Sequence, residues 1–462
     1  MKKYVSVLSG FLVAIIIWGF SIPVTAQKMP DDYAAHYNKV MERTAWWREA
    51  RFGMFIHFGA YAVPGRGEWV KSNERLTTQQ YQPFIDAFKP EDFDPKAWAK
   101  TAKAAGMKYA VLTAKHHDGF SLYDSKLSDY TLSKTWGGRD LVREFLDAFR
   151  AEGIRVGLYY SIIDWHHPDY PNVGNHPQRD DSLYGKQKFN WDSYLKYMHG
   201  QVEELVTKYG KLDIMWFDYS FDKYTGDKWK AKELVEMVRK HQPGIILDNR
   251  LETHEGSSSQ KRMLSLLGDF ETPEQGIPDE PIVDKFGNAV PWETCLTLNN
   301  VWGFSAFDDN WKSPELIVQT LINCVSKNGN LLLNVGPDAK GNIPAESVRI
   351  LESVGQWMKK NGESIYGGGS AGLSKPNWGA YTKKGNRVFA HWMYPHIGMI
   401  SAKGIDVNQI KGIYLLPTGS QLSYTATWWG NMEPGNCFIQ MGQRPDKPFP
   451  YSTVADIHLK VP

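Results

Sequence analysis

The 462-residue chain has little cysteine, no excess of charge of either sign, and a single long apolar run at its N-terminus. Its three cysteines, Cys295, Cys324 and Cys437, are too few and too scattered for a disulfide scaffold or a thiolate zinc site. Lysine and arginine total 53 against 51 acidic residues, and like charges are never grouped into a block. We therefore expect neither nucleic acid nor an anionic membrane surface as a partner.

The composition otherwise resembles that of a large globular protein. Hydrophobic residues make up 42% of the chain, which excludes disordered, collagen-like and coiled-coil classes. Aromatic residues reach 13%, with 18 Trp and 23 Tyr. Such a surplus suits sugar-stacking surfaces and also a large core, so on its own it does not decide between them. The length allows several domains, or one barrel with an appended domain.

The N-terminal residues have the pattern of a secretory signal. Lys2 and Lys3 precede an uncharged apolar stretch at residues 11–20, and small residues follow before a polar one. A membrane anchor would need about 20 apolar residues, and Pro23 interrupts this run too early. The pattern predicts a cleaved signal peptide at residues 1–26. We expect export, into a Gram-negative periplasm in preference to full secretion, with no membrane attachment after cleavage.

One helix–strand unit recurs along most of the chain. In its first copy, Asp94 opens a helix that Gly106 ends, and an apolar strand follows at residues 108–113. Later copies lie at residues 140–160, 192–218 and 229–247, with further strands expected at 52–56, 294–298 and 331–335. Apolar strands that alternate with amphipathic helices indicate a parallel sheet with right-handed crossovers. The units suffice for an eight-stranded (β/α)8-like TIM barrel; an open sheet stays possible, although no glycine-rich phosphate turn follows a strand.

The pattern changes near the C-terminus. After a helix expected at residues 344–360, Gly367 to Gly369 resemble a hinge, and short strands with turn residues follow. We therefore predict a catalytic (β/α) barrel at 27–362 and a small antiparallel β-sandwich at 363–462. Four tryptophans of this second domain are expected in the sandwich core rather than on a sugar-binding surface: Trp378, Trp392, Trp428 and Trp429.

Polar residues follow the predicted strands, where parallel barrels carry their active sites. The residues at these strand ends are His57, Lys115-His116-His117-Asp118, Tyr159-Tyr160, Asp218 and Arg250. Any one could be an ordinary polar residue at the end of a strand. Together, at one end of one sheet, they indicate a site.

The adjacent His116 and His117 suggest a metal centre, but the pattern disfavours it. Neighbours in an extended chain point to opposite faces, so these two could not readily share one ion. Neither a His-x-x-x-His helix nor a cysteine pair supplies the missing ligands. We expect hydrogen bonds to a substrate, with no metal and no cofactor. We also expect Cys295 and Cys324 to be buried free thiols.

Asp218 lies two residues after Trp216, so both side chains lie on the same face of their strand. Cleavage of a glycosidic bond needs two carboxyl groups, one to attack or stabilise the sugar and one to protonate the leaving oxygen. Spacing alone does not choose the second carboxyl group. The candidates are Glu68, Glu271, Glu274 and Glu293.

Taken together, these motifs resemble glycoside hydrolase family 29, the α-L-fucosidases. The matching phrases keep the family's order over most of residues 30–362, and include Lys115-His-His-Asp-Gly-Phe120, Trp216-Phe-Asp218 and Trp292-Glu-Thr-Cys295. The other matching phrases lie at residues 47–59, 67–69, 157–161, 269–274 and 328–337. The resemblance implies a (β/α) barrel followed by a C-terminal β-sandwich, in agreement with the pattern above.

The same resemblance implies a retaining exo-α-L-fucosidase of the broad-specificity branch, which acts on fucosylated oligosaccharides or glycoconjugates through a covalent fucosyl-enzyme. It makes Asp218 the nucleophile and Glu274 the acid/base, with Glu293 as the alternative acid/base. The substrate contacts that it implies are His57, Glu68, Trp69, His116, His117, Tyr160 (or its neighbour Tyr159), Trp216 and Arg250.

Three alternatives stay open at this point. One is an exo-glycosidase that acts on an L-galactoside, since L-fucose is 6-deoxy-L-galactose. Another is a carbohydrate-binding protein that has lost its chemistry, although both kinds of catalytic carboxyl group are present. A third gives the main role to residues 364–462 as an adhesin or partner-binding module. The pattern does not indicate an oligomeric state.

Overall fold

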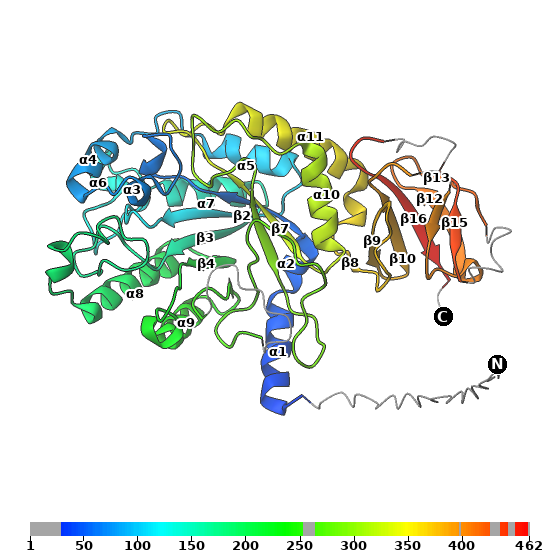
Figure 1. The fold of residues 1–462 in the computed structure, drawn as a ribbon, viewed down its shortest axis with the longest axis horizontal. Coiled ribbons are helices and arrows are strands. Elements are labelled where there is room, and N and C mark those ends of the chain that lie inside the picture. The colour runs from blue at the N-terminus through cyan, green and yellow to red at the C-terminus, as the bar shows by residue number, and fades with distance from the viewer. Residues whose placement is uncertain (1–28, 253–263, 397–398, 426–434, 442–448, 461–462) are drawn as a thin grey trace, which may run out of the picture.

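The structure is a computed structural model, and it divides into an α/β part and a smaller C-terminal β part (Figure 1). It describes residues 29–252, 264–396, 399–425, 435–441 and 449–460. The predicted signal peptide at 1–26 lies outside the described residues, as do Trp428 and Trp429.

The α/β part is built on seven parallel strands, in the order β5-β4-β3-β2-β1-β7-β6. Nearly every strand residue is buried, as a sheet covered by helices requires. The strands are β1 (Phe52–Ile56), β2 (Tyr109–Lys115), β3 (Arg155–Ser161), β4 (Ile214–Asp218), β5 (Ile246–Leu247), β6 (Glu293–Thr297) and β7 (Asn330–Val335).

An extended segment at residues 269–274 closes this sheet into a ring. On one side its Phe270 forms a parallel bridge with Asp248, just after β5. On the other side Glu274 forms a parallel bridge with Cys295 of β6. Because β7 pairs with β1, the segment acts as the eighth strand of a closed barrel. The predicted (β/α)8-like architecture is therefore confirmed.

Helices lie outside the barrel, and their capping residues match the predicted signals. The Asp94 carboxylate accepts the backbone N–H groups of Lys96 and Ala97, and the Asp140 carboxylate accepts that of Arg143. The helices are α1 (Asp31–Arg43), α2 (Ala45–Ala50), α3 (Val70–Asn73), α4 (Thr78–Ala87), α5 (Pro95–Ala104), α6 (Leu132–Thr135), α7 (Leu141–Ala151), α8 (Trp191–Lys208), α9 (Ala231–His241), α10 (Pro314–Val325) and α11 (Ala345–Asn361). None of the helices in the described ranges is long and apolar enough to cross a membrane.

The C-terminal part contains two antiparallel sheets, with strand orders β13-β12-β16-β10-β9-β8 and β11-β15-β14. Along β10, alternate side chains serve two cores: Val388 and Trp392 pack between the sheets, whereas Phe389 packs with the barrel core. Trp378 also packs between the sheets, so the core role predicted for Trp378 and Trp392 is confirmed. The strands are β8 (Gly369–Ser370), β9 (Gly379–Lys384), β10 (Arg387–Trp392), β11 (Ile400–Ala402), β12 (Ile410–Leu415), β13 (Ser420–Gln421), β14 (Tyr424–Thr425), β15 (Cys437–Ile439) and β16 (Thr453–Leu459).

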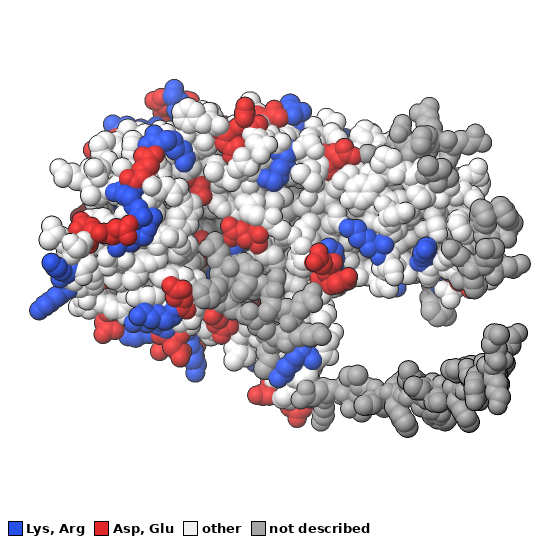
Figure 2. All heavy atoms as spheres, in the orientation of Figure 1, with Lys and Arg blue, Asp and Glu red and all other residues white. Residues whose placement is uncertain are grey.

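The surface agrees with the balanced composition. Figure 2 shows acidic and basic side chains interspersed on the visible face, without a large patch of one sign. Cys295, Cys324 and Cys437 are buried and not bonded to one another, as expected for the first two.

Candidate active site

A pocket opens at the carboxyl ends of the barrel strands. Twelve side chains from neighbouring parts of the barrel line it: Phe55, His57, Trp69, His116, His117, Tyr159, Trp216, Asp218, Arg250, Glu274, Cys295 and Trp302.

Two carboxylates in this pocket share one guanidinium group. Arg250 Nη1 donates to Asp218 Oδ1 and Nη2 donates to Glu274 Oε2, both at 2.8 Å. Its Nε donates to Thr272 Oγ1 at 2.9 Å, and its Cζ lies 4.5 Å from the centre of the Trp216 ring. Arg250 is thus held on three sides, and it fixes the two carboxylates next to each other.

Tyr159 holds the other oxygen of Asp218. Its hydroxyl donates to Oδ2 at 2.6 Å, so both oxygens of this carboxylate are hydrogen-bonded. Tyr160 instead points away from the pocket and donates to Gln201 of α8 at 2.9 Å. The choice of Tyr160 as a substrate contact is therefore wrong. Tyr159 pairs with Trp216 across β3 and β4, and partners in a parallel ladder point to the same side.

His116 and His117 both line the pocket, with ring centroids 4.0 Å apart. The expectation that they point to opposite faces is wrong, because β2 ends at Lys115 and the chain then turns. The Gly119 N–H donates to the His116 carbonyl, and Gly119 adopts a φ of 84°. Among the described residues no group of three or more His, Cys, Asp or Glu side chains could hold a metal ion.

The rings of His57 and His117 are neutral at neutral pH. Burial lowers the pKa of His57 to about 4 and that of His117 to about 3. Burial also lowers the pKa of His116 well below its ordinary value. These side chains therefore enter the chemistry as hydrogen-bonding groups and not as cations.

Comparison with known proteins identifies the family to which the chain belongs. The family model described as Alpha-L-fucosidase matches residues 21–363. The chain belongs to the α-L-fucosidase family. It is therefore a glycoside hydrolase, as the resemblance of its motifs predicted.

Related α-L-fucosidases match over most of their length. The tissue α-L-fucosidase of Mus musculus is 31% identical over 422 residues, which cover 82% of this chain and 85% of the mouse protein. Isoenzyme 1 from Paenibacillus thiaminolyticus has a TM-score of 0.86 and 49% identity, covering 92% of this chain and 100% of that one. A GH29 α-L-fucosidase of Bacteroides thetaiotaomicron, solved as a trapped covalent intermediate with 2-fluoro-fucosyl fluoride, has a TM-score of 0.78 and 28% identity, covering 91% and 96%.

In this α-L-fucosidase, two of the predicted site residues lie at different depths. Trp69 is partly buried and lines the pocket. Glu68 is buried behind it, and its Oε2 accepts the backbone N–H groups of Trp302 and Gly303 at 3.1 and 2.7 Å. Glu68 thus holds the loop that brings Trp302 to the pocket.

Glu293 lies beneath the pocket floor. It is fully buried in the barrel, where Trp47 Nε1 and Trp216 Nε1 donate to its carboxylate at 3.2 and 3.4 Å, and the Tyr109 hydroxyl donates as well. Burial raises its pKa to about 7. Of the two acid/base candidates, only Glu274 lines the pocket with Asp218.

Sequence reasoning missed three polar residues that support the pocket. Asn334 at the end of β7 contacts His57, Ser161 at the end of β3 contacts His117, and Thr272 contacts Arg250. Asn334 and Ser161 lie where a predicted strand ends, so their position was the available signal. Thr272 lies within the segment at 269–274 and had no such signal. Phe55, Cys295 and Trp302 also line the pocket without having been predicted to do so.

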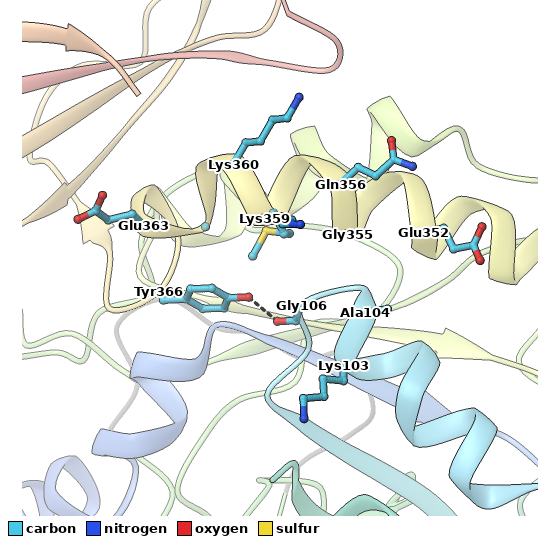
Figure 3. Close-up of a pocket in the computed structure, with 12 residues that line it drawn as sticks. Lys103, Ala104, Gly106, Glu352, Gly355, Gln356, Lys359, Lys360, Glu363 and Tyr366 are labelled. Atoms are coloured by element: carbon cyan, nitrogen blue, oxygen red, sulfur yellow. Dashed lines mark hydrogen bonds between the residues drawn. The ribbon is translucent and has the colours of Figure 1, made fainter. Parts of the chain in front are cut away.

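A larger groove elsewhere lacks the chemistry of this pocket. It lies between α5 and α11, where the Tyr366 hydroxyl donates to the Gly106 carbonyl (Figure 3). Its side chains carry mixed charge, with Lys103, Lys359 and Lys360 near Glu352 and Glu363. A pair of carboxylates joined by Arg250 distinguishes the smaller pocket.

Tyr159 and Tyr160 form a matched pair for mutation. Tyr159→Phe is expected to lower kcat by about 10²-fold, because it removes a preorganised donor from the Asp218 carboxylate. Tyr160→Phe removes a hydroxyl that donates to Gln201, away from the pocket. The kcat of this variant should therefore stay close to that of the wild type. Steady-state kinetics on an aryl α-L-fucoside measure both. A larger loss from Tyr160→Phe would contradict the orientation of β3.

Glu293→Gln is expected to gain stability relative to the wild type as pH rises. In the folded protein the pKa of Glu293 is raised from 4.5 to about 7, so its contribution to stability is complete below pH 4.5 and is lost as pH rises through 7. Glutamine mimics the protonated form at every pH. The difference in free energy of unfolding should therefore change by about 3 kcal/mol between pH 4.5 and 8. Urea titrations at several pH values measure it, and a constant difference would refute it.

Proposed function

We propose that this α-L-fucosidase is a retaining exo-enzyme that releases terminal α-L-fucosyl residues from fucosylated oligosaccharides or glycoconjugates, with Asp218 as nucleophile and Glu274 as acid/base. The observation that carries the proposal is the sharing of Arg250 by these two carboxylates, which line one pocket. Retention needs the two carboxyl groups close together, ~5–5.5 Å apart, and one guanidinium group spans a gap of that order.

The two carboxylates would act in turn. Asp218 attacks the anomeric carbon from the β face while Glu274 gives a proton to the leaving glycosidic oxygen, which forms a β-linked fucosyl-enzyme. Glu274 then takes a proton from water, and that water displaces Asp218 to restore the α configuration. At rest Arg250 and Tyr159 hold the Asp218 carboxylate in place, so the nucleophile needs no reorientation.

The walls of the pocket suit a 6-deoxy sugar. His57, His116 and His117 supply polar atoms, whereas Phe55 forms an aromatic corner with Trp216 and Trp302, at centroid distances of 5.3 and 6.0 Å. A methyl group at C5 can pack in such a corner. The hydroxymethyl group of an L-galactoside would bring a hydroxyl to the same aromatic surface, so we propose the fucoside as the preferred substrate.

Hydrolysis of matched aryl glycosides tests this proposal. The enzyme is expected to cleave the aryl α-L-fucoside with a kcat/KM about 10²-fold above that of the aryl α-L-galactoside, since an apolar pocket rejects an added hydroxyl by about that factor. Proton NMR during turnover should show α-L-fucose as the first product. β-L-Fucose first would refute retention. Binding of L-fucose without turnover of either glycoside would favour the inactive carbohydrate-binding alternative.

We also propose export to the periplasm. Lys2, Lys3 and the apolar run at 11–20 support it, and the first described helix, α1, begins at Asp31, after the predicted cleavage point. Cell fractionation of the expressed full chain, followed by N-terminal sequencing, tests it. A mature N-terminus at Gln27 in the periplasmic fraction would agree, and an uncleaved cytoplasmic chain would refute it.

A further inference from the structure

Two of the pocket histidines make a hydrogen bond on the side of the ring that faces away from the pocket. His57 Nδ1 lies 2.7 Å from Asn334 Oδ1, and His117 Nδ1 lies 2.7 Å from Ser161 Oγ. Both rings line the pocket. Since each Nδ1 is already paired, the Nε2 atom is the ring nitrogen that each histidine can offer to a ligand.

The partner of His57 has a fixed orientation. Asn334 Nδ2 donates to the carbonyl oxygen of Trp302 at 2.7 Å. A carbonyl can only accept, so the amide must point its nitrogen at Trp302 and its oxygen at His57. The hydrogen between Asn334 and His57 therefore belongs to His57 Nδ1. In the neutral ring, Nε2 then carries no hydrogen and is an acceptor.

The partner of His117 is fixed in the same way. Ser161 has one hydroxyl hydrogen, and its Oγ lies 2.8 Å from the carbonyl oxygen of Ile163, which can only accept. Ser161 thus donates to Ile163 and accepts from His117 Nδ1. His117 Nε2 lies 3.8 Å from Asp218 Oδ2, too far for a hydrogen bond, and both atoms are acceptors.

Both rings must be neutral for this assignment to hold. His57 and His117 are almost completely buried, and burial lowers the pKa of each ring despite the attraction of nearby carboxylates. The charged and titratable groups that act on these rings are Asp218, Glu274, Lys115, Arg250 and the neighbouring pocket histidines.

We propose that Asn334 and Ser161 are positioning residues that hold His57 and His117 in the Nδ1–H tautomer, so that both Nε2 atoms accept hydrogen bonds from hydroxyl groups of the sugar. The inference rests on the proposed function for the nature of the ligand. His116 differs, because its buried Nδ1 has no hydrogen-bond partner among the described residues. The pocket therefore favours sugars that can donate a hydroxyl hydrogen at each of two positions.

Nitrogen-15 NMR of the histidine-labelled enzyme tests the tautomers directly. Two-bond ¹⁵N–¹H spectra near neutral pH are expected to show protonated Nδ1 and unprotonated Nε2 for both residues, with assignments from the signals lost in His57→Gln and His117→Gln. A protonated Nε2 on either ring would overturn the proposal for that ring. The readout needs no turnover. If the spectra agree but fucosides are not hydrolysed, the proposed function fails and the tautomer assignment stands.

Ser161 variants test whether the partner sets the tautomer. Ser161→Ala is expected to give His117 a mixture of tautomers and to raise KM for an aryl α-L-fucoside about tenfold, with a smaller change in kcat. Ser161→Thr keeps the hydroxyl and should restore both the spectrum and KM. An unchanged His117 spectrum in Ser161→Ala would overturn the role of Ser161. Asn334→Leu tests the role of Asn334 toward His57 by the same two readouts.

Deoxy and deoxyfluoro analogues of L-fucose, used as competitive inhibitors, test the direction of the hydrogen bonds. Fluorine cannot donate a hydrogen, so at positions that contact His57 or His117 both analogues should lose affinity equally, by about tenfold. A position of the sugar is assigned to His57 if the loss of affinity caused by the analogue disappears in His57→Gln. It is assigned to His117 if that loss disappears in His117→Gln. A fluoro analogue that keeps the affinity of L-fucose at such a position would show that the histidine donates, and would overturn the proposal.

Discussion

Replacement of Asp218 by glycine is expected to lower kcat on an aryl α-L-fucoside by at least about 10⁴-fold, because it removes the carboxylate that we propose as the nucleophile. Arg250 keeps its bonds to Glu274 and Thr272, so the rest of the pocket should stay in place. Azide can then enter the vacated position and attack from the β face. Steady-state kinetics with and without azide measure the rescue, and the product should be β-L-fucosyl azide.

Asp213, which directly precedes the same strand, offers a matched control. It precedes β4 at the opposite end from Asp218, where it pairs with Arg155 and Lys211 at 3.2 and 3.3 Å. Asp213→Asn should retain nearly all activity and should not respond to azide. An Asp218→Gly enzyme that keeps most of its activity would assign the nucleophile elsewhere. Rescue that yields α-L-fucosyl azide would contradict a double displacement.

Asp269→Ala is expected to lower the free energy of unfolding by about 3–5 kcal/mol, the usual cost of breaking a buried ion pair. Asp269 is fully buried, and Arg43 of α1 and Arg239 of α9 donate to its carboxylate at 2.6 and 3.1 Å. The same carboxylate accepts the backbone N–H of Leu247 at 2.9 Å. Its removal takes an acceptor from both guanidinium groups and from the Leu247 amide, although Arg239 keeps its bond to the Leu267 carbonyl. Urea unfolding followed by tryptophan fluorescence measures the loss.

An exposed pair provides the comparison. Asp192 contacts Lys230 at 3.3 Å, with both side chains more than half exposed, and Asp192→Ala should leave the unfolding midpoint almost unchanged. Asp269→Ala should also reduce fucosidase activity, because Glu274 lies on the segment that Asp269 anchors. Equal stability of the two variants would show that the Arg43–Asp269–Arg239 cluster does not hold this segment.

Much of the barrel could be predicted because its units repeat a local pattern. Asp94 and Asp140 mark helix starts, and continuous apolar runs mark the buried strands. The segment at 269–274 escaped prediction as a strand, since it contains proline and three acidic residues. Side-chain contacts of Asp269 and isolated bridges hold the segment in the sheet. These are tertiary contacts, and the strand propensities of the local residues do not reveal them.

The sequence predicted which residues form the candidate site better than it predicted how their side chains are oriented. The motifs indicated Asp218 and Glu274, and the structure brings them to one guanidinium group. The choice between Tyr159 and Tyr160 required the register of β3 against β4, which depends on tertiary pairing. The orientation of His116 and His117 depended on where β2 stops and the chain turns. The roles of Asn334 and Ser161 depended on contacts between distant strands.

The eighth strand of the barrel also links catalysis to the completion of folding. Residues 269–274 join β5 to β6 by isolated bridges and by the side-chain contacts of Asp269, and Glu274 is at the end of this segment. Until the ring is closed there, the chain can contain nearly all its helices and strands and still lack one of the two carboxylates proposed to be catalytic. Recovery of fucosidase activity during refolding is therefore expected to report closure of the ring, whereas circular dichroism reports the formation of the helices and strands. The active site thus provides a kinetic marker for barrel closure.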